Sequence, residues 1–187
     1  MLSLPAEIVV SDFILSHIKP TRDIAMALFD VFSGDFDNMR FWLRGGKMDS
    51  VDAVLNGLVR AYNCDKMHMF EIMHGGELIG EIGFASINEK NKTVYVDYWL
   101  TPNARGYGII DKMLPVIEKM AFEDLNMNKV ILGIDVENTA SRKVAERNEY
   151  KLDGVLRENK MWVDGSVHDE CVYSKLKSEW IKEQKNA

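Results

Sequence analysis

The first third of the chain shows one strand-like pattern followed by two helix-like patterns. Residues 13–18 alternate between apolar and polar side chains and end before Pro20, which disfavours continued regular structure. Thr21 can cap a helix in which apolar residues recur at helical spacing, namely Ile24, Ala27, Leu28 and Val31. A second helical pattern follows Ser50, with Val51, Val54, Leu55, Leu58 and Val59 on one side. We therefore expect one strand and then two helices.

The middle of the chain is rich in β-forming residues. Residues 69–73, 78–87 and 93–100 are three short β-rich runs. Turn-forming residues separate them, His74-Gly75-Gly76 in the first gap and residues 88–91 in the second. This spacing predicts an antiparallel meander.

Helical and strand patterns alternate in the last part of the chain. Residues 110–121 have a helical pattern, although Pro115 removes a backbone hydrogen bond at a cost of about 3 kcal/mol, so we expect a kink near residues 111–115. A β-rich run at 129–136 precedes a short helix at 141–148. Two further β-rich runs flank the Asp164-Gly165 pair, a typical hairpin signal. The predicted order is β-α-α-β-β-β-α-β-α-β-β.

Length and composition indicate a single globular domain over residues 1–187. The chain is 47% hydrophobic and 28% charged, and it contains no internal repeat or low-complexity tract. Its start lacks the pattern of a signal peptide, and no apolar run reaches the roughly 18 to 20 residues that span a bilayer. We expect a cytoplasmic protein.

Charge and cysteine content narrow the function. The formal charge of −6 disfavours broad binding to nucleic acids or anionic membranes and favours a cationic substrate. Cys64 and Cys171 are far apart and have no nearby Cys or His partner, which argues against a zinc site or a disulfide framework. We interpret both as small core residues.

A glycine turn follows the third strand of the predicted meander. Gly106 and Gly108 lie between that strand and the next predicted helix, so free backbone N–H groups converge at a helix N-terminus. This arrangement suits a phosphate group, and glycine permits close backbone approach. A tight structural turn is the alternative interpretation. Neither the Walker pattern nor the full dinucleotide fingerprint occurs, so another kind of nucleotide cofactor is indicated.

Four motifs in order give the chain a family resemblance. They are Tyr98-Trp99-Leu100, Arg105-Gly106-Tyr107-Gly108, residues 137–144, and Val163-Asp164-Gly165 with His168-Asp169 and Tyr173. Through them, residues 13–180 resemble the GNAT acetyltransferases, and within that family the branch that acetylates the N-termini of ribosomal proteins. The resemblance implies an α/β (α+β) fold, with a mixed, mostly antiparallel seven-stranded sheet flanked by about four helices. It also implies a homodimer.

The resemblance further implies acetyl-CoA as cosubstrate and no metal. The pantetheine arm would lie between residues 94–101 and 129–136. Cofactor-binding positions would be the backbone near Trp99 and Leu100, the amide of Asn138, and the pyrophosphate-binding amides of Arg105, Gly106, Tyr107, Gly108, Ile109 and Ile110. The Arg105 side chain would add a phosphate contact. The family often has Gln or Arg where this chain has Asn103.

The reaction implied is direct attack of a neutral amine on the thioester, with Ser141 as proton donor to the leaving thiolate. Asn138 and Ser141 also suit a helix cap, which is the alternative interpretation. We take Asp97 and Glu81 as candidates for the base, with surface salt bridges as the alternative. In the ribosomal branch a carboxylate can follow the serine-bearing helix, and Glu158 lies near that position. His168 is a further candidate for substrate contact.

The acceptor remains open at this point. We expect the N-terminal α-amine of a ribosomal protein, while a small-molecule amine, such as a polyamine or an aminoglycoside-like compound, is the alternative. A non-catalytic module that binds coenzyme A is a third hypothesis. The two early helices and residues 41–44 between them would wall the acceptor side, with Trp42 interpreted as a core residue.

Overall fold

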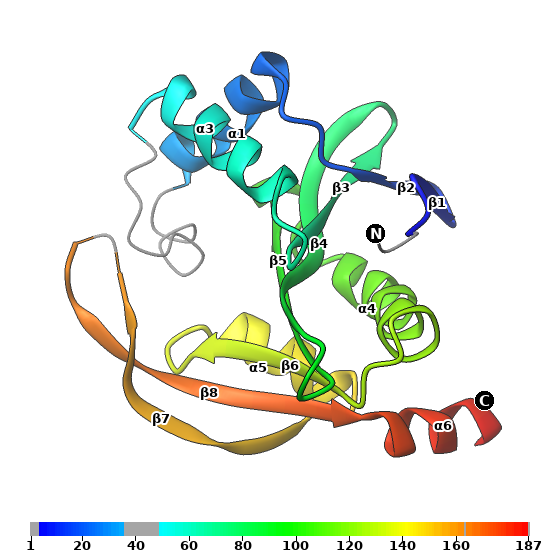
Figure 1. Ribbon diagram of the computed structural model, residues 1–187. Coiled ribbons are helices and arrows are strands. Elements are labelled where there is room, and N and C mark those ends of the chain that lie inside the picture. Colours follow the sequence, from blue (N-terminus) through cyan, green and yellow to red (C-terminus); the bar gives the residue numbers. More distant parts are fainter. Residues whose placement is uncertain (1–3, 36–48, 163, 187) are drawn as a thin grey trace.

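A computed structural model describes residues 4–35, 49–162 and 164–186. Its centre is an eight-stranded sheet with the order β1-β2-β3-β4-β5-β6-β8-β7 (Figure 1). The strands are β1 (Glu7–Val10), β2 (Phe13–His17), β3 (His68–His74), β4 (Glu77–Asn88), β5 (Thr93–Leu100), β6 (Lys129–Asp135), β7 (Lys151–Met161) and β8 (Val167–Leu176). The β5–β6 pair is parallel, and its neighbours in the sheet are antiparallel.

The helices cover both faces of the sheet. They are α1 (Arg22–Gly34), α3 (Val51–Tyr62), α4 (Ile109–Lys119), α5 (Thr139–Arg147) and α6 (Lys177–Asn186). Figure 1 shows α1 and α3 together on one side of strands β3 to β5 and α4 on the other side. The mixed α/β class predicted from the sequence is confirmed.

Side-chain caps fix the starts of the two early helices. The Thr21 hydroxyl accepts a hydrogen bond from the backbone N–H of Ile24 at 3.3 Å, and the Ser50 hydroxyl accepts one from Ala53 at 3.2 Å. Each bond satisfies a backbone donor that has no partner inside its helix. The capping predicted for Thr21 is therefore confirmed.

Two hydrophobic clusters lie on the two faces of the sheet. The larger one joins α4 to the sheet through side chains such as Met113, Leu114 and Phe70. The second cluster packs α1 and α3 against the sheet and includes Leu28 and Trp99. Because neighbouring residues of a strand point to opposite faces, β5 contributes to both clusters and is held on both sides.

The helix α4 runs without a break through Pro115. Its departure from α-helical geometry comes in the next turn, where Met120–Asp124 forms a π-helical segment. Such segments are rare and usually occur as single turns inside α-helices. The kink expected near residues 111–115 stays a prediction, and the π-helical segment lies after that region.

The structure adds two elements that the sequence pattern does not reveal. Strand β1 makes the sheet eight-stranded rather than seven-stranded; it has only four residues, too few for a recognisable alternation. Helix α6 lacks a broad apolar stripe and packs through Trp180, whose ring centre lies 5.4 Å from that of Phe122. Both elements depend on tertiary packing rather than on a local pattern.

One core prediction is wrong, and another lies beyond the described residues. Cys171 is buried as expected, but Cys64 is exposed. It follows the end of α3 in a turn, where its backbone N–H bonds to the carbonyl of Ala61, and this places its side chain outside the apolar face. Residues 41–44, including Trp42, are outside the described ranges.

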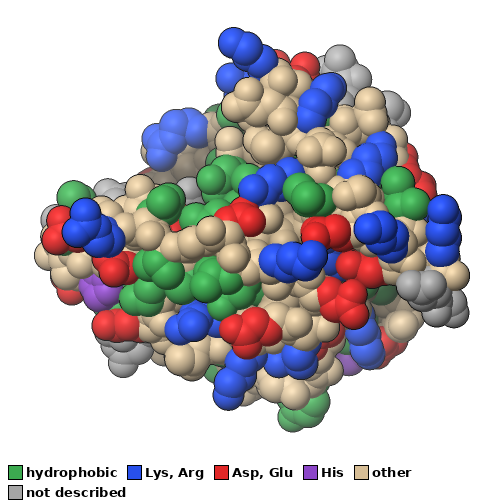
Figure 2. Space-filling view, turned by 90° about the horizontal axis from the view of Figure 1, so that it is seen from below, with side chains coloured by type: hydrophobic (Ala, Val, Ile, Leu, Met, Phe, Trp, Pro, Cys, Tyr) green, Lys and Arg blue, Asp and Glu red, His purple; other side chains and the backbone are tan. Residues whose placement is uncertain are grey.

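The surface carries charges of both signs. On the face shown in Figure 2, basic and acidic side chains are interspersed with hydrophobic ones. That face therefore has no broad field of one sign. Within the described ranges, every helix is too short or too polar to cross a membrane.

Candidate active site

Strands β5 and β6 diverge and leave a cavity between them. Their ladder consists of three pairs, the last joining Tyr95 to Ile131. Beyond the Tyr95–Ile131 pair, the backbone N–H and C=O groups that β5 and β6 turn toward each other no longer form hydrogen bonds of the ladder. The cavity has a volume of about 240 Å³. Its lining comes from β5, β6, β7, the glycine turn, the start of α4, and α5 with its N-cap: Val96, Asp97, Tyr98, Trp99, Leu100, Arg105, Gly106, Ile110, Leu132, Gly133, Ile134, Asp135, Asn138, Ala140, Ser141, Val144 and Lys160.

The glycine turn stands at the edge of this cavity. Gly106 and Gly108 have φ angles of 83° and 67°, in the left-handed region that favours glycine. Gly108 is the N-cap of α4 and offers no side-chain cap, so the first amides of the helix lack side-chain partners. A Cβ at Gly106 would meet no atom within 4 Å, so there is room for a group against the backbone. These observations fit a diphosphate.

The other predicted residues of the turn divide into two groups. Ile110 lines the cavity, whereas Tyr107, Gly108 and Ile109 are outside the lining. Tyr107 is exposed, and the side chain of Ile109 is buried in the core. The turn can therefore contribute through its backbone amides rather than through these side chains.

Arg105 ties the turn to the end of β5. Its Nε and Nη2 donate hydrogen bonds to the carbonyl oxygen of Leu100 at 3.0 and 2.8 Å. The guanidinium also forms an ion pair with Asp35 at the end of α1. The side chain lines the cavity but is already bonded, so in this structure it fixes the turn.

Asn138 and Ser141 lie together on the α5 side of the cavity. The side-chain oxygen of Asn138 accepts a 3.1 Å hydrogen bond from the backbone N–H of Ser141, so the predicted helix cap is confirmed. Among the described residues, neither the Asn138 amide nitrogen nor the Ser141 hydroxyl has a hydrogen-bond partner. Capping therefore leaves both groups available to a ligand.

Tyr98 is a residue that the sequence reasoning did not single out for chemistry. Its hydroxyl donates to the backbone oxygen of Ser141 at 3.4 Å, across the cavity from β5 to α5. Burial raises the pKa of the Tyr98 phenol to about 12. The phenol thus keeps its proton at neutral pH and anchors α5 to β5.

The two predicted base candidates are separated by the fold. Asp97 lines the cavity, whereas Glu81 does not. Glu81 is only 2% exposed and accepts a 2.9 Å hydrogen bond from the indole of Trp99. Burial, and to a smaller extent the facing carboxylate of Glu71, raises the pKa of Glu81 to about 8, although the hydrogen bond from Trp99 acts in the opposite direction. Position therefore favours Asp97 for contact with a substrate.

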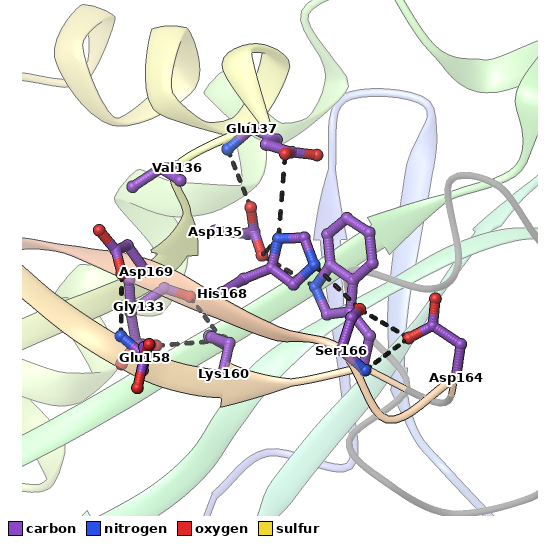
Figure 3. Close-up of polar contacts among 12 residues, drawn as sticks. Gly133, Asp135, Val136, Glu137, Glu158, Lys160, Asp164, Ser166, His168 and Asp169 are labelled. Carbon is purple, nitrogen blue, oxygen red and sulfur yellow. Dashed lines mark hydrogen bonds and ion pairs between the residues drawn. The ribbon is translucent and has the colours of Figure 1, made fainter.

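Glu158 does not line the cavity. It lies where the β7–β8 register shifts, has a φ angle of 54°, and is exposed. Its backbone N–H donates to Asp169 at 2.9 Å (Figure 3). Among the described residues of β7, Lys160 rather than Glu158 lines the cavity.

His168 belongs to a polar cluster beside the cavity. Its ring stacks on the indole of Trp162 with the centres 3.5 Å apart and an interplanar angle of 10°. The same indole donates to Asp135 at 2.8 Å. Figure 3 shows His168 facing Asp135 and Glu137, whose ligand atoms all lie within 4.8 Å of one another and of the His168 ring, so the three could hold a metal ion. The absence of a metal stays a prediction.

The ion pair between Lys160 and Glu170 lies at the cavity, and the sequence analysis did not predict it. The Lys160 ammonium lies 3.1 Å from a Glu170 carboxylate oxygen and 3.1 Å from the carbonyl oxygen of Gly133. Asn159 donates to the other oxygen of Glu170 at 2.5 Å. No local motif identifies these residues, because strands β6, β7 and β8 bring them together only in the folded sheet.

Comparison with known proteins places these features in context. Residues 12–151 match the acetyltransferase (GNAT) domain family. The "Putative ribosomal N-acetyltransferase YdaF" of Bacillus subtilis (strain 168) is 33% identical over 113 residues, covering 60% of this chain and 61% of that relative. The "Ribosomal-protein-serine acetyltransferase" of Escherichia coli (strain K12) is 31% identical over 108 residues, covering 58% of this chain and 60% of the relative. The match thus spans about three fifths of each relative.

Solved structures share the fold over nearly the whole chain. An acetyltransferase structure from T. thermophilus has a TM-score of 0.84 at 22% identity, covering 97% of this chain and 95% of that one. RimL, a ribosomal α-N-protein acetyltransferase solved with coenzyme A, has a TM-score of 0.77 at 21% identity, covering 91% and 97%. MccE, a microcin C7 self-immunity acetyltransferase solved with acetyl-CoA and AMP, has a TM-score of 0.79 at 21% identity, covering 94% and 98%. At these identities the likeness is one of fold.

Proposed function

Because this chain belongs to the GNAT acetyltransferase family, we propose that it transfers the acetyl group of acetyl-CoA to the N-terminal α-amine of a protein. A ribosomal protein is the first acceptor to test, since two relatives carry that substrate in their names. The observation that carries the proposal is the divergence of β5 and β6 after Tyr95, beside a helix N-terminus that has no side-chain cap. An elongated molecule with a diphosphate at one end suits that arrangement.

The cosubstrate would lie along the diverging strands. The backbone of β5 from residue 96 onward would pair with the amides of the pantetheine arm, and the Asn138 amide nitrogen would add a hydrogen bond. The amides of residues 105–110 would hold the diphosphate. Arg105 would keep the turn in place through Leu100 and Asp35.

The reaction would proceed by direct attack. The neutral amine nitrogen of the acceptor bonds to the thioester carbon, and a backbone N–H of β5 stabilises the resulting oxyanion. The C–S bond then breaks, the amine proton passes to Asp97 through water, and the Ser141 hydroxyl donates a proton to the leaving thiolate. Asp97 then releases its proton to water, and water returns one to Ser141, so that both side chains end as they began. An α-amine has a pKa near 8, so a carboxylate is a sufficient base.

A small-molecule amine is the alternative acceptor. A lysine-like amine, with a pKa near 10.4, asks more of the base than an α-amine does. The MccE structure shows that a similar fold serves a protein named for microcin self-immunity, but at 21% identity this concerns the fold alone. The α-amine therefore remains the proposed acceptor.

Two measurements test the proposal. Calorimetry with coenzyme A should show binding at a single class of site. Mass spectrometry of ribosomal-protein N-terminal peptides beside polyamines, after incubation with acetyl-CoA, should show acetylation of the peptides. If only the polyamines were acetylated, the acceptor would be a small-molecule amine rather than a protein N-terminus. Binding without any turnover would indicate a module that only holds coenzyme A.

A further inference from the structure

Lys160 presents an unused hydrogen-bond donor to the cavity. Its ammonium has three N–H groups, and two of them are used by the Gly133 carbonyl and the Glu170 carboxylate. Lys160 and Gly133 are labelled in Figure 3. Among the described residues the ammonium has no further partner. The side chain is only 11% exposed, and it lines the cavity. The third N–H is therefore available to donate to an oxygen of a ligand that enters the cavity.

Gly133 makes room for this ion pair at the point where the strands part. It lies on β6 shortly beyond the last ladder residue, Ile131. A Cβ at Gly133 would come within 2.3 Å of the Glu170 carboxylate oxygen, so a larger residue would push the pair away. The glycine therefore leaves room for the Glu170 carboxylate that pairs with the cavity-lining Lys160.

Lys160 and Asp97 approach the cavity from different strands. Asp97 belongs to β5, whereas Lys160 reaches the β6 wall from β7, and both residues line the same space. An acceptor whose amine meets Asp97 would bring its neighbouring atoms toward the Lys160 ammonium.

We propose that Lys160 donates a hydrogen bond to the carbonyl oxygen of the acceptor's first residue and so selects amines that are α to a carbonyl group. In a protein N-terminus that oxygen is three bonds from the reacting nitrogen. A polyamine or a lysine side chain has no oxygen at this distance. The inference rests on the proposed acetyl transfer and adds to it a reason for choosing α-amines.

The test compares two acceptors that differ only in their first peptide group, which one of them lacks together with its carbonyl oxygen. The first is a short peptide that begins with alanine, and the second is its alkene isostere, in which a trans C=C replaces the first peptide bond. The ratio of kcat/KM for the peptide to that for the isostere is measured in the wild type and in Lys160→Met. We expect the wild type to prefer the peptide and the variant to lose about tenfold or more of that preference, since hydrogen bonds to charged groups are the strong ones.

Further variants separate recognition from simple structural support. Lys160→Arg keeps the charge and should retain part of the preference. Lys129→Met is the matched control, because Lys129 pairs with Asp153 and does not line the cavity, and its ratio should equal that of the wild type. The double variant Lys160→Met/Glu170→Gln leaves no buried charge unpaired and should lose the preference as the single variant does.

Each failure has its own signature. A wild type that acetylates both acceptors equally well, or a Lys160→Met variant in which both rates fall by the same factor, overturns the role of Lys160. A wild type that binds coenzyme A and acetylates neither acceptor overturns the proposed function itself.

Discussion

The indole Nε1 of Trp99 donates a 2.9 Å hydrogen bond to the Oε2 of Glu81 on the neighbouring strand, and both side chains are buried. The bond joins β5, at the cavity, to β4 beneath α1 and α3. Glu81 therefore acts on the site through Trp99 and has no direct contact with the cavity. It is best regarded as a positioning residue.

The first prediction concerns Glu81→Gln and pH. Burial raises the pKa of Glu81 from 4.5 to about 8. Below the lower value, both the folded and the unfolded chain carry the proton. Between the two pKa values, the carboxyl ionises in the unfolded chain but stays protonated in the folded one, so the wild type loses stability as pH rises. The loss ends near pH 8, where the folded carboxyl also ionises. Glutamine removes this loss and can still accept the indole hydrogen bond.

The free energy of unfolding of Glu81→Gln, relative to wild type, should therefore rise between about pH 5 and about pH 8. The scale is about 1.4 kcal/mol per pKa unit, which gives a few kcal/mol in total. Urea denaturation at both pH values measures it. Glu77→Gln, at an exposed position of the same strand, is the control and should show no such change. A pH-independent difference for Glu81→Gln would contradict the buried, protonated carboxyl.

The second prediction assigns the base. Asp97→Asn keeps the size of the side chain and removes the proton acceptor, so kcat/KM should fall by about 10² to 10⁴. Coenzyme A affinity, measured by calorimetry, should change little. If turnover survives in Asp97→Asn and is lost in Glu81→Gln, the base acts from the other strand and the assignment is wrong.

The third prediction concerns Ser141→Ala. The backbone N–H of Ser141 still donates to Asn138 in this variant, so the cap of α5 remains. Release of free thiol from acetyl-CoA should slow by about 10- to 100-fold, while thermal stability and coenzyme binding stay close to wild type. Undiminished release would indicate that water or Tyr98 protonates the thiolate.

The fourth prediction compares two glycines with similar backbone angles. Gly106 and Gly165 have φ angles of 83° and 87°, and a Cβ at either would meet no atom within 4 Å. Alanine at either position should cost about 1 to 3 kcal/mol of stability from backbone strain. Only Gly106→Ala should also weaken coenzyme A binding, because its methyl group would enter the space proposed for the diphosphate. If the two variants bound coenzyme A with equal affinity, the proposal that the turn binds the diphosphate would be wrong.

Much of the fold follows from local signals. Thr21 and Ser50 mark helix starts that the structure confirms, and the β-rich runs around Gly75-Gly76 become paired strands. The glycine turn and Asn138 are recognisable because each depends on a short stretch of chain, a positive φ angle in one case and a helix cap in the other. Local chemistry of this kind is visible in a sequence.

The Lys160–Glu170 pair shows what is not visible. Strand β8 lies between β6 and β7 in the sheet, although β7 precedes β8 in the sequence. Lys160 of β7 therefore contacts Gly133 of β6 from beyond β8. The sequence pattern of β7 does not predict this contact, because nearly all of that strand is exposed and no buried face stands out. Such a contact depends on sheet order and register, which the packing of the whole domain determines.

The short ladder between β5 and β6 also links ligand binding to thermal behaviour. With only three residue pairs joining the two strands, the ligand-free domain has a discontinuous sheet that the pantetheine amides would complete. A ligand that binds only the folded state raises the melting temperature of the protein, and the increase grows with the logarithm of the ligand concentration. Under the proposed function, coenzyme A would therefore add its binding free energy to the stability of the folded domain.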